Sequence, residues 1–257
     1  MVTLPRTVRI KLDVSSVLHI TKLMNRIYVK FTASIVVGII QLLVLSAHHI
    51  YNDMRILQNN IQSICTSLPL LQNAAQRLQI DAILLQEVWH LLDGFLKLRQ
   101  FNNTITKLRN VCEGGGVAII THKDTKTVHM KQYEIDGLEA VWADVMCGSI
   151  RTIIGSVYIP PGDFKAMELF DTVIGNIISS HCHVIVGMDA NARCLLWDDK
   201  CIGIAQYCAS IKMGTSLENI IDKYNFDVLN DGSCTYHSGR YSSAPDVTIS
   251  GGLVNIN

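Results

Sequence analysis

The sequence predicts an α/β (α+β) fold from residue 54 onward: a four-layer sandwich of two mixed β-sheets flanked by helices. Short apolar runs typical of strands alternate with segments whose apolar residues recur at every third and fourth position, as in amphipathic helices. Glu139–Met146 and Ile150–Tyr158 are separated only by Cys147-Gly148-Ser149, a short turn that favours an antiparallel hairpin. Because helices separate most other strands, parallel and antiparallel pairs should occur in the same sheet.

The individual elements follow from these patterns. Expected strands are Met54–Asn60, Ala82–Gln86, Gly116–Thr121, Thr127–Gln132, Leu138–Met146, Ile150–Tyr158, Val184–Met188 and Asp246–Ser250. Expected helices are Leu68–Leu78, Lys165–Ile178 and Thr215–Tyr224. A hydrophobic content of 49% is ample for the buried core of such a domain.

Residues 1–53 form an N-terminal extension of different character, followed by the predicted domain at 54–257. The segment 31–52 carries no charged residue and is long enough to cross a bilayer. Lys22, Arg26 and Lys30 precede it, as the positive-inside rule requires of a membrane anchor. The alternatives are a buried or disordered extension, or upstream sequence misjoined to the domain.

Charge and cysteine content leave the function open. The 22 basic and 22 acidic residues cancel, which neither indicates nor excludes a local nucleic-acid-binding groove. The eight cysteines are scattered along a long chain, so we interpret them as reduced thiols. Neither His181-Cys182-His183 nor the series Cys194, Cys201, Cys208 has the paired spacing of a zinc site.

Polar residues interrupt the apolar strands at their ends. They are Asn60, Glu87, Tyr158, Asp189, Asn191 and Asp246. Polar groups at strand ends converge on one rim of a sheet, where carboxylates and amides offer hard oxygen ligands for Mg²⁺ or Mn²⁺. Such residues also occur for purely structural reasons. Asn60 suits a turn before a helix, and Asp189 and Asn191 suit the start of a loop.

In chain order the motifs resemble the endonuclease domains of non-LTR retrotransposons, within the endonuclease/exonuclease/phosphatase superfamily. The similar segments are ILQNNIQSI, ILLQEVW, GGGVAII, GSVYIPPG, VIVGMDANARCLLWD and the stretch from GTSLENII to DVTIS. The resemblance implies that Asn60 and Glu87 are metal ligands and that Tyr158, Asp189, Asn191 and Asp246 are catalytic. The resemblance also implies a packing role for the glycines of GGGVAII, which are Gly114, Gly115 and Gly116.

The implied activity is Mg²⁺- or Mn²⁺-dependent phosphodiester hydrolysis, with DNA as partner and no small-molecule cofactor. The family's last strand carries a Ser-Asp-His motif that has no counterpart here, so we expect a domain with its last strand missing and impaired activity. The alternatives are an inactive remnant or binding module, or a phosphodiesterase or phosphatase of the same superfamily. A DNA substrate favours nuclear or cytoplasmic localisation, and a membrane is expected only through residues 31–52.

Overall fold

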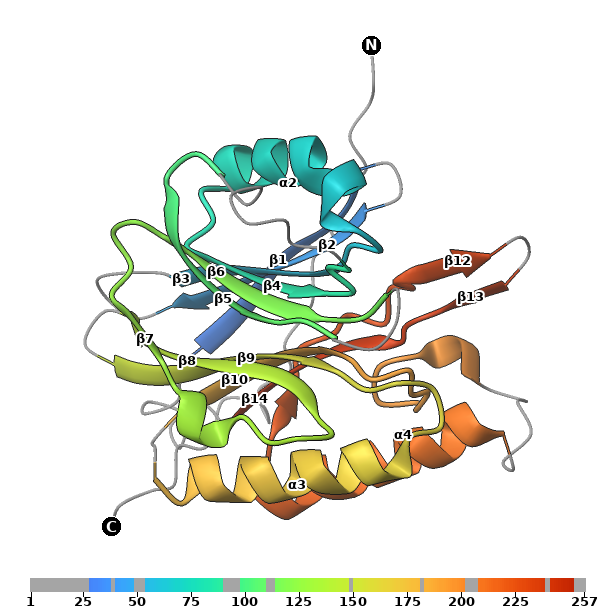
Figure 1. The fold of residues 1–257 in the computed structure, drawn as a ribbon. Coiled ribbons are helices and arrows are strands. Elements are labelled where there is room, and N and C mark those ends of the chain that lie inside the picture. The colour runs from blue at the N-terminus through green and yellow to red at the C-terminus, as the bar shows by residue number, and fades with distance from the viewer. Residues whose placement is uncertain are drawn as a thin grey trace, which may run out of the picture.

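The structure is a computed structural model that describes residues 28–37, 40–48, 54–89, 98–109, 114–147, 150–180, 183–201, 208–238 and 241–251. Two six-stranded sheets lie face to face, with helices on the outside of each (Figure 1). The helix α2 (Ile64–Leu78) covers one sheet, and α3 (Phe164–Ile178) and α4 (Ala209–Tyr224) cover the other. The four-layer sandwich predicted from the sequence is therefore confirmed.

The first sheet has the strand order β1-β2-β3-β4-β6-β5. Its strands are β1 (Tyr28–Val37), β2 (Ile40–His48), β3 (Met54–Asn60), β4 (Ala82–Gln86), β5 (Phe101–Lys107) and β6 (Val117–His122). Only β3 and β4 are parallel, and the other neighbouring strands are antiparallel. The helix α2 provides the crossover that a parallel pair requires.

The second sheet has the order β11-β14-β10-β9-β8-β7, and it repeats the same arrangement around one parallel pair, β9–β10. Its strands are β7 (Thr127–His129), β8 (Glu139–Cys147), β9 (Ile150–Tyr158), β10 (Val184–Asp189), β11 (Asp227–Val228) and β14 (Asp246–Gly251). A separate hairpin of β12 (Tyr236–Ser238) and β13 (Tyr241–Ser243) projects from the body of the domain (Figure 1). The predicted hairpin at 139–158 is β8–β9.

Strand alternation explains how three apolar clusters fill the spaces between the layers. Side chains such as Ile56, Leu84 and Ile154 point between the two sheets. Alternate residues of the same strands point outward, so Leu57 and Leu85 pack under α2, while Val186 packs under α3 and α4. Both faces of the central strands are thus buried, and these strands read as continuous apolar runs.

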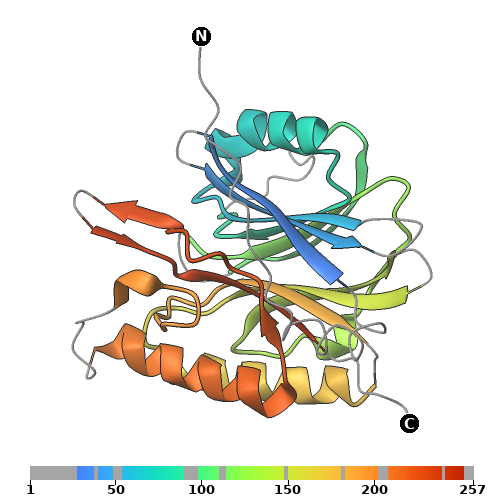
Figure 2. The same cartoon turned by 180° about the vertical axis from the view of Figure 1, so that it is seen from behind.

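The apolar N-terminal segment contributes two strands to the first sheet. β1 and β2 form an antiparallel hairpin, and β2 pairs with the edge of β3 that β4 does not occupy (Figure 2). Among the residues that the structure describes, no helix is long and apolar enough to cross a membrane. Residues 1–27 and 49–53 lie outside the described ranges, and the division of the chain at residue 53 stays a prediction.

Candidate active site

The carboxyl ends of both parallel strand pairs meet at one rim of the sandwich. In the second sheet, Asp189 at the end of β10 lies opposite Tyr158 of β9 and opposite Asp246 of β14. In the first sheet, Asn60 at the end of β3 pairs with the residue that precedes Glu87. The side chain of Asn60 donates from Nδ2 to Oδ2 of Asp189 over 2.6 Å, which joins the two halves of the rim.

A left-handed backbone brings Glu87 into this rim. Glu87 has φ 53° and Trp89 has φ 60°, a conformation that side-chain-bearing residues seldom adopt. Backbone bonds maintain it: Ser63 N donates to Glu87 O at 2.9 Å, and Trp89 N donates to Gly115 O at 2.9 Å. The indole Nε1 of Trp89 donates to Oε2 of Glu87 at 3.0 Å, so the carboxylate is tied to its own chain segment.

Tyr158 is 7% exposed, and its hydroxyl is hydrogen-bonded to the Glu87 carboxylate. Burial, and then the nearby negative charge of Glu87, raise the pKa of this phenol far above its ordinary value. The Arg109 guanidinium lies 5.6 Å from the ring centroid and lowers the pKa in part. Tyr158 therefore stays protonated at any physiological pH and acts as a hydrogen-bond donor.

Arg109 is itself held by Glu139, the residue opposite Tyr158 in the β8–β9 ladder. The Arg109 Nε donates to Glu139 Oε1 at 2.6 Å, and the amide of Gly116 donates to Oε2 at 2.8 Å. A Cβ atom at Gly115, which has φ 74°, would lie 2.7 Å from the guanidinium. The glycine triplet thus serves close packing, and it connects the Glu87 segment with the Tyr158 environment.

Asp189 and Asp246 form a buried acidic pair. Asp189 is 3% exposed and accepts hydrogen bonds from Asn60 and, at 3.1 Å, from the amide of Asn191. Burial and the charge of Asp246 raise the pKa of Asp189 well above its ordinary value, although these hydrogen bonds oppose the change. Burial also raises the pKa of Asp246 to about 6, and Glu87 adds to the effect.

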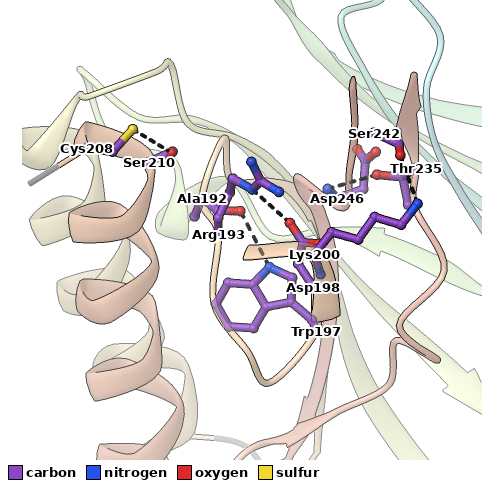
Figure 3. A network of polar contacts seen from close by, with 10 residues as sticks. All are labelled: Ala192, Arg193, Trp197, Asp198, Lys200, Cys208, Ser210, Thr235, Ser242 and Asp246. Carbon is purple, nitrogen blue, oxygen red and sulfur yellow. Dashed lines mark hydrogen bonds and ion pairs between the residues drawn. The ribbon is translucent and has the colours of Figure 1, made fainter. Parts of the chain in front are cut away.

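The loop after β10 carries Asn191, and Figure 3 shows the Arg193–Asp198 and Trp197–Ala192 contacts within this loop. Asn191 has φ 46°, and its Nδ2 donates to the carbonyl of Ile159 at 3.0 Å, which leaves one amide proton for another acceptor. The loop is closed by Arg193, whose Nε donates to the fully buried Asp198 at 2.8 Å. Trp197, 1% exposed, donates from its indole to the Ala192 carbonyl at 3.5 Å.

These side chains fit a hard divalent cation. The donor set at the rim consists of carboxylate and amide oxygens, which Mg²⁺ and Mn²⁺ prefer. Oδ1 of Asp246 is buried and has no hydrogen-bond partner among the described residues, so the site has an excess of negative charge to compensate. In the described ranges, no group of three or more His, Cys, Asp or Glu side chains lies close enough together to hold a metal ion by itself.

The structure thus brings together all six residues expected from the sequence, whereas their roles stay predictions. It adds Trp89, Arg109 and Glu139, which the sequence analysis did not select. Of the histidine-cysteine cluster, His181 and Cys182 lie outside the described residues. His183 directly precedes β10, whereas Asp189 ends this strand, so the two residues lie at its two ends. The His183 ring contacts Thr152 and Ser250, and burial lowers its pKa to about 4.

Solved structures of other proteins share the architecture of this domain. The chain is similar to the endonuclease domain of TRAS1, a telomere-specific non-LTR retrotransposon, with TM-score 0.60 and 19% identity over 77% of this chain and 85% of that one. It is similar to the 3′ phosphatase NExo from Neisseria bound to product DNA hairpin, with TM-score 0.60 and 16% identity over 77% and 86%. It is also similar to the AP endonuclease LMAP from Leishmania major, with TM-score 0.62 and 11% identity over 80% of this chain and 81% of that one.

At these identities the likeness shows the fold alone, a DNase I-like four-layer sandwich. Residues 152–257 match the protein family described as endonuclease-reverse transcriptase. The matched part contains Tyr158, Asp189, Asn191 and Asp246. No curated protein sequence matches the chain.

Proposed function

We propose that this chain is a metal-dependent endonuclease of retrotransposon origin that nicks DNA by phosphodiester hydrolysis. The observation that carries the proposal is the 2.6 Å hydrogen bond between Asn60 and Asp189, because it joins the oxygen ligands of one sheet to the acidic pair of the other. The family match over residues 152–257 and the likeness to a retrotransposon endonuclease support the substrate and the origin.

Each side chain has a chemical role in this proposal. Glu87 and Asn60 would hold Mg²⁺ or Mn²⁺, and the bound ion would supply positive charge to a phosphate oxygen. Asp189, whose carboxylate accepts hydrogen bonds from Asn60 and from the Asn191 amide, would orient or deprotonate the attacking water. Tyr158 and the remaining amide proton of Asn191 would donate hydrogen bonds to the phosphate.

We expect turnover to be slow. In the described part of the chain, no histidine is hydrogen-bonded to Asp189 or Asp246, and Oδ1 of Asp246 is left without a partner. An absent acid–base or electrostatic group commonly lowers the rate by about 10² to 10⁴. Added imidazole would test this expectation, because it would supply an acid–base group from solution and should then accelerate nicking.

The decisive experiment is a nicking assay on supercoiled plasmid with Mg²⁺, with Glu87→Ala and Asp189→Ala beside the unmodified chain. Asp124→Ala is the matched control, since this acid is 76% exposed in the turn between β6 and β7. We expect nicking that both site substitutions abolish and the control leaves unchanged. Nicking that survives Glu87→Ala would contradict the metal role of Glu87.

Two other outcomes point to different functions. A folded protein that binds DNA and never nicks it would be a binding module derived from a nuclease. Release of phosphate from a 3′-phosphorylated oligonucleotide would indicate a phosphatase, a reaction suggested by the likeness to the Neisseria 3′ phosphatase. Acting on DNA, the chain would be expected in the nucleus or, before import, in the cytoplasm.

A further inference from the structure

The Glu87 carboxylate has a specific donor that follows it by only two residues. Trp89 Nε1 lies 3.0 Å from Oε2 of Glu87, and Gly114 lies beside the same nitrogen, where an added Cβ would stand 3.7 Å away. Such a Cβ would be in ordinary van der Waals contact with the indole. A hydrogen bond to an ionised acceptor is among the stronger ones in proteins.

The backbone around Trp89 is strained in a way that serves this contact. Positive φ at both Glu87 and Trp89 is unfavourable, and it persists only where the surroundings impose it. Here Val88 N and Trp89 N donate to the carbonyls of Gly116 and Gly115. These bonds turn the chain so that the side chains of Glu87 and Trp89 come to the same side and meet.

Burial does not explain the position of Trp89. Its side chain is 38% exposed, whereas Trp142 and Trp197, which complete the tryptophans of the chain, are 0% and 1% exposed. Trp89 therefore buries less of its ring than the other two tryptophans do. Its indole N–H is hydrogen-bonded to the Glu87 carboxylate.

We propose that Trp89 is a positioning residue, which orients Glu87 for the divalent cation through its indole N–H. One carboxylate oxygen is fixed by the indole, so the side chain has a defined rotamer and presents its remaining lone pairs to the rim. This inference rests on the proposed metal-dependent function. An exposed indole that instead stacked on a nucleobase would require the ring and would not require the N–H.

The test separates the N–H from the ring. Trp89→Phe keeps an aromatic ring and removes the donor, and Trp89→Ala removes both. Mn²⁺ affinity is measured from the electron paramagnetic resonance signal of free Mn²⁺, which does not depend on catalysis. We expect both variants to bind Mn²⁺ about 10- to 100-fold more weakly than the unmodified chain, as for other partners that orient metal ligands.

The kcat and the KM for plasmid should likewise distinguish the loss of the N–H from the loss of the ring. With Mn²⁺ raised to saturate the weakened site, Trp89→Phe should recover most of its kcat and show an unchanged KM for plasmid. Normal Mn²⁺ affinity in Trp89→Phe, together with a raised KM for DNA in Trp89→Ala, would overturn the inference and indicate base stacking. Circular dichroism confirms that each variant is folded.

A measurement on the unmodified chain guards against loss of folding. Mn²⁺ is a quencher of indole fluorescence, and Trp89 is the exposed tryptophan. Quenching should therefore saturate with the same Mn²⁺ affinity as the resonance titration and should disappear in Glu87→Ala. If Glu87→Ala binds Mn²⁺ as the unmodified chain does, the proposed metal site fails, and the role of Trp89 fails with it. If Mn²⁺ binding depends on Glu87 and is indifferent to Trp89→Phe, only the inference about Trp89 fails.

Discussion

At the scale of the single residue, the hydroxyl of Tyr158 is the best-defined of the hydrogen-bond donors proposed for the phosphate. It is buried, bonded to Glu87, and kept protonated by its raised pKa. Tyr158→Phe removes one donor and keeps the ring beneath Arg109, so the fold should persist. We expect kcat to fall by about 10² to 10³, the range for one donor aimed at developing charge.

Plasmid nicking at saturating Mg²⁺ measures this change. Tyr236→Phe is the matched control, because Tyr236 is 45% exposed on the projecting hairpin. Since the Tyr158 pKa lies far above neutrality, the pH profile of the unmodified chain should show no phenol titration up to pH 9. Equal rates for Tyr158→Phe and the unmodified chain would remove Tyr158 from the catalytic set.

Asp246 is predicted to lower stability at neutral pH. Its pKa is about 6 in the folded chain and 3.8 ordinarily, so protonation favours the folded state. That contribution is complete below pH 3.8 and is lost as the pH rises through 6. Asp246→Asn should therefore increase the free energy of unfolding at pH 8 by up to about 3 kcal/mol while it abolishes nicking.

Urea unfolding at pH 8 and pH 4 checks this prediction, because the advantage of Asp246→Asn should shrink at the lower pH. Asp124→Asn, at an exposed position, is the matched control for this measurement. If Asp246→Asn is less stable at both pH values, the prediction is wrong, and the ionised Asp246 carboxylate makes stabilising contacts beyond those described above.

At the scale of the element, α4 fixes the loop that carries Asn191. Gly214 lies within α4, where a Cβ atom would stand 2.0 Å from the carbonyl oxygen of Arg193. Arg193 N also donates to Ser210 O at 2.9 Å, so helix and loop are in direct backbone contact. The helix can approach this closely only because residue 214 lacks a side chain.

Gly214→Ala should therefore destabilise the fold by about 1 to 3 kcal/mol and reduce nicking, since the loop must move away from α4. Gly175→Ala in α3 is the matched control. Its Cβ would meet the terminal hydroxyl of Tyr224 at 2.7 Å, and that side chain can move. Thermal unfolding and nicking rates distinguish the two, and equal effects would argue against a special role for the α4 contact.

At the scale of the whole molecule, buried polar side chains connect the two sheets next to the site. Gln58 of β3 donates to the Met188 carbonyl of β10 at 2.9 Å and accepts from the hydroxyl of Thr248 of β14. Gln86 of β4 donates to Ser156 Oγ of β9 at 2.9 Å. Because Gln58 is two residues from Asn60, and Met188 precedes Asp189, these bonds set how the halves of the rim meet.

A double-mutant cycle tests this connection. Gln58→Leu and Thr248→Val should each destabilise by about 1 to 3 kcal/mol, because each leaves a buried partner unsatisfied. The double variant should be destabilised by about 1 kcal/mol less than the sum of the two single variants, because both substitutions remove the same buried contact. Gln58→Leu combined with Thr215→Val, on the exposed face of α4, should be additive within about 0.5 kcal/mol in urea unfolding.

Strands and helices that bury a regular face were predictable from the sequence. The helix α3 was expected at Lys165–Ile178 and occupies Phe164–Ile178, with an N-cap from Asp163. The strand β5 was missed, since only Phe101 and Ile105 of Phe101–Lys107 are buried and an edge strand of this kind lacks alternation. The helix α4 begins at Ala209, earlier than the expected Thr215, because Gly214 serves a close contact and does not mark a boundary.

The polar residues that gather at the rim were predictable because polar groups that end apolar strands are conspicuous in sequence, as at Glu87 and Asp189. Trp89 and Arg109 were not selected, since nothing local distinguishes an indole that donates to a carboxylate from one that packs in a core. The segment 31–52 was interpreted by length and hydrophobicity alone, and strand pairing with β3 depends on residues elsewhere in the chain.

The sequence by itself determined the fold class, the order of the main elements and the chemical types available at the strand ends, because these depend on local periodicity and composition. Only the tertiary structure decided that Asn60 meets Asp189 across two sheets, that Tyr158 is hydrogen-bonded to Glu87, and that the indole N–H of Trp89 donates to the same carboxylate. These contacts join residues on different strands and loops. They arise from packing two sheets in one register, and no local pattern encodes that register.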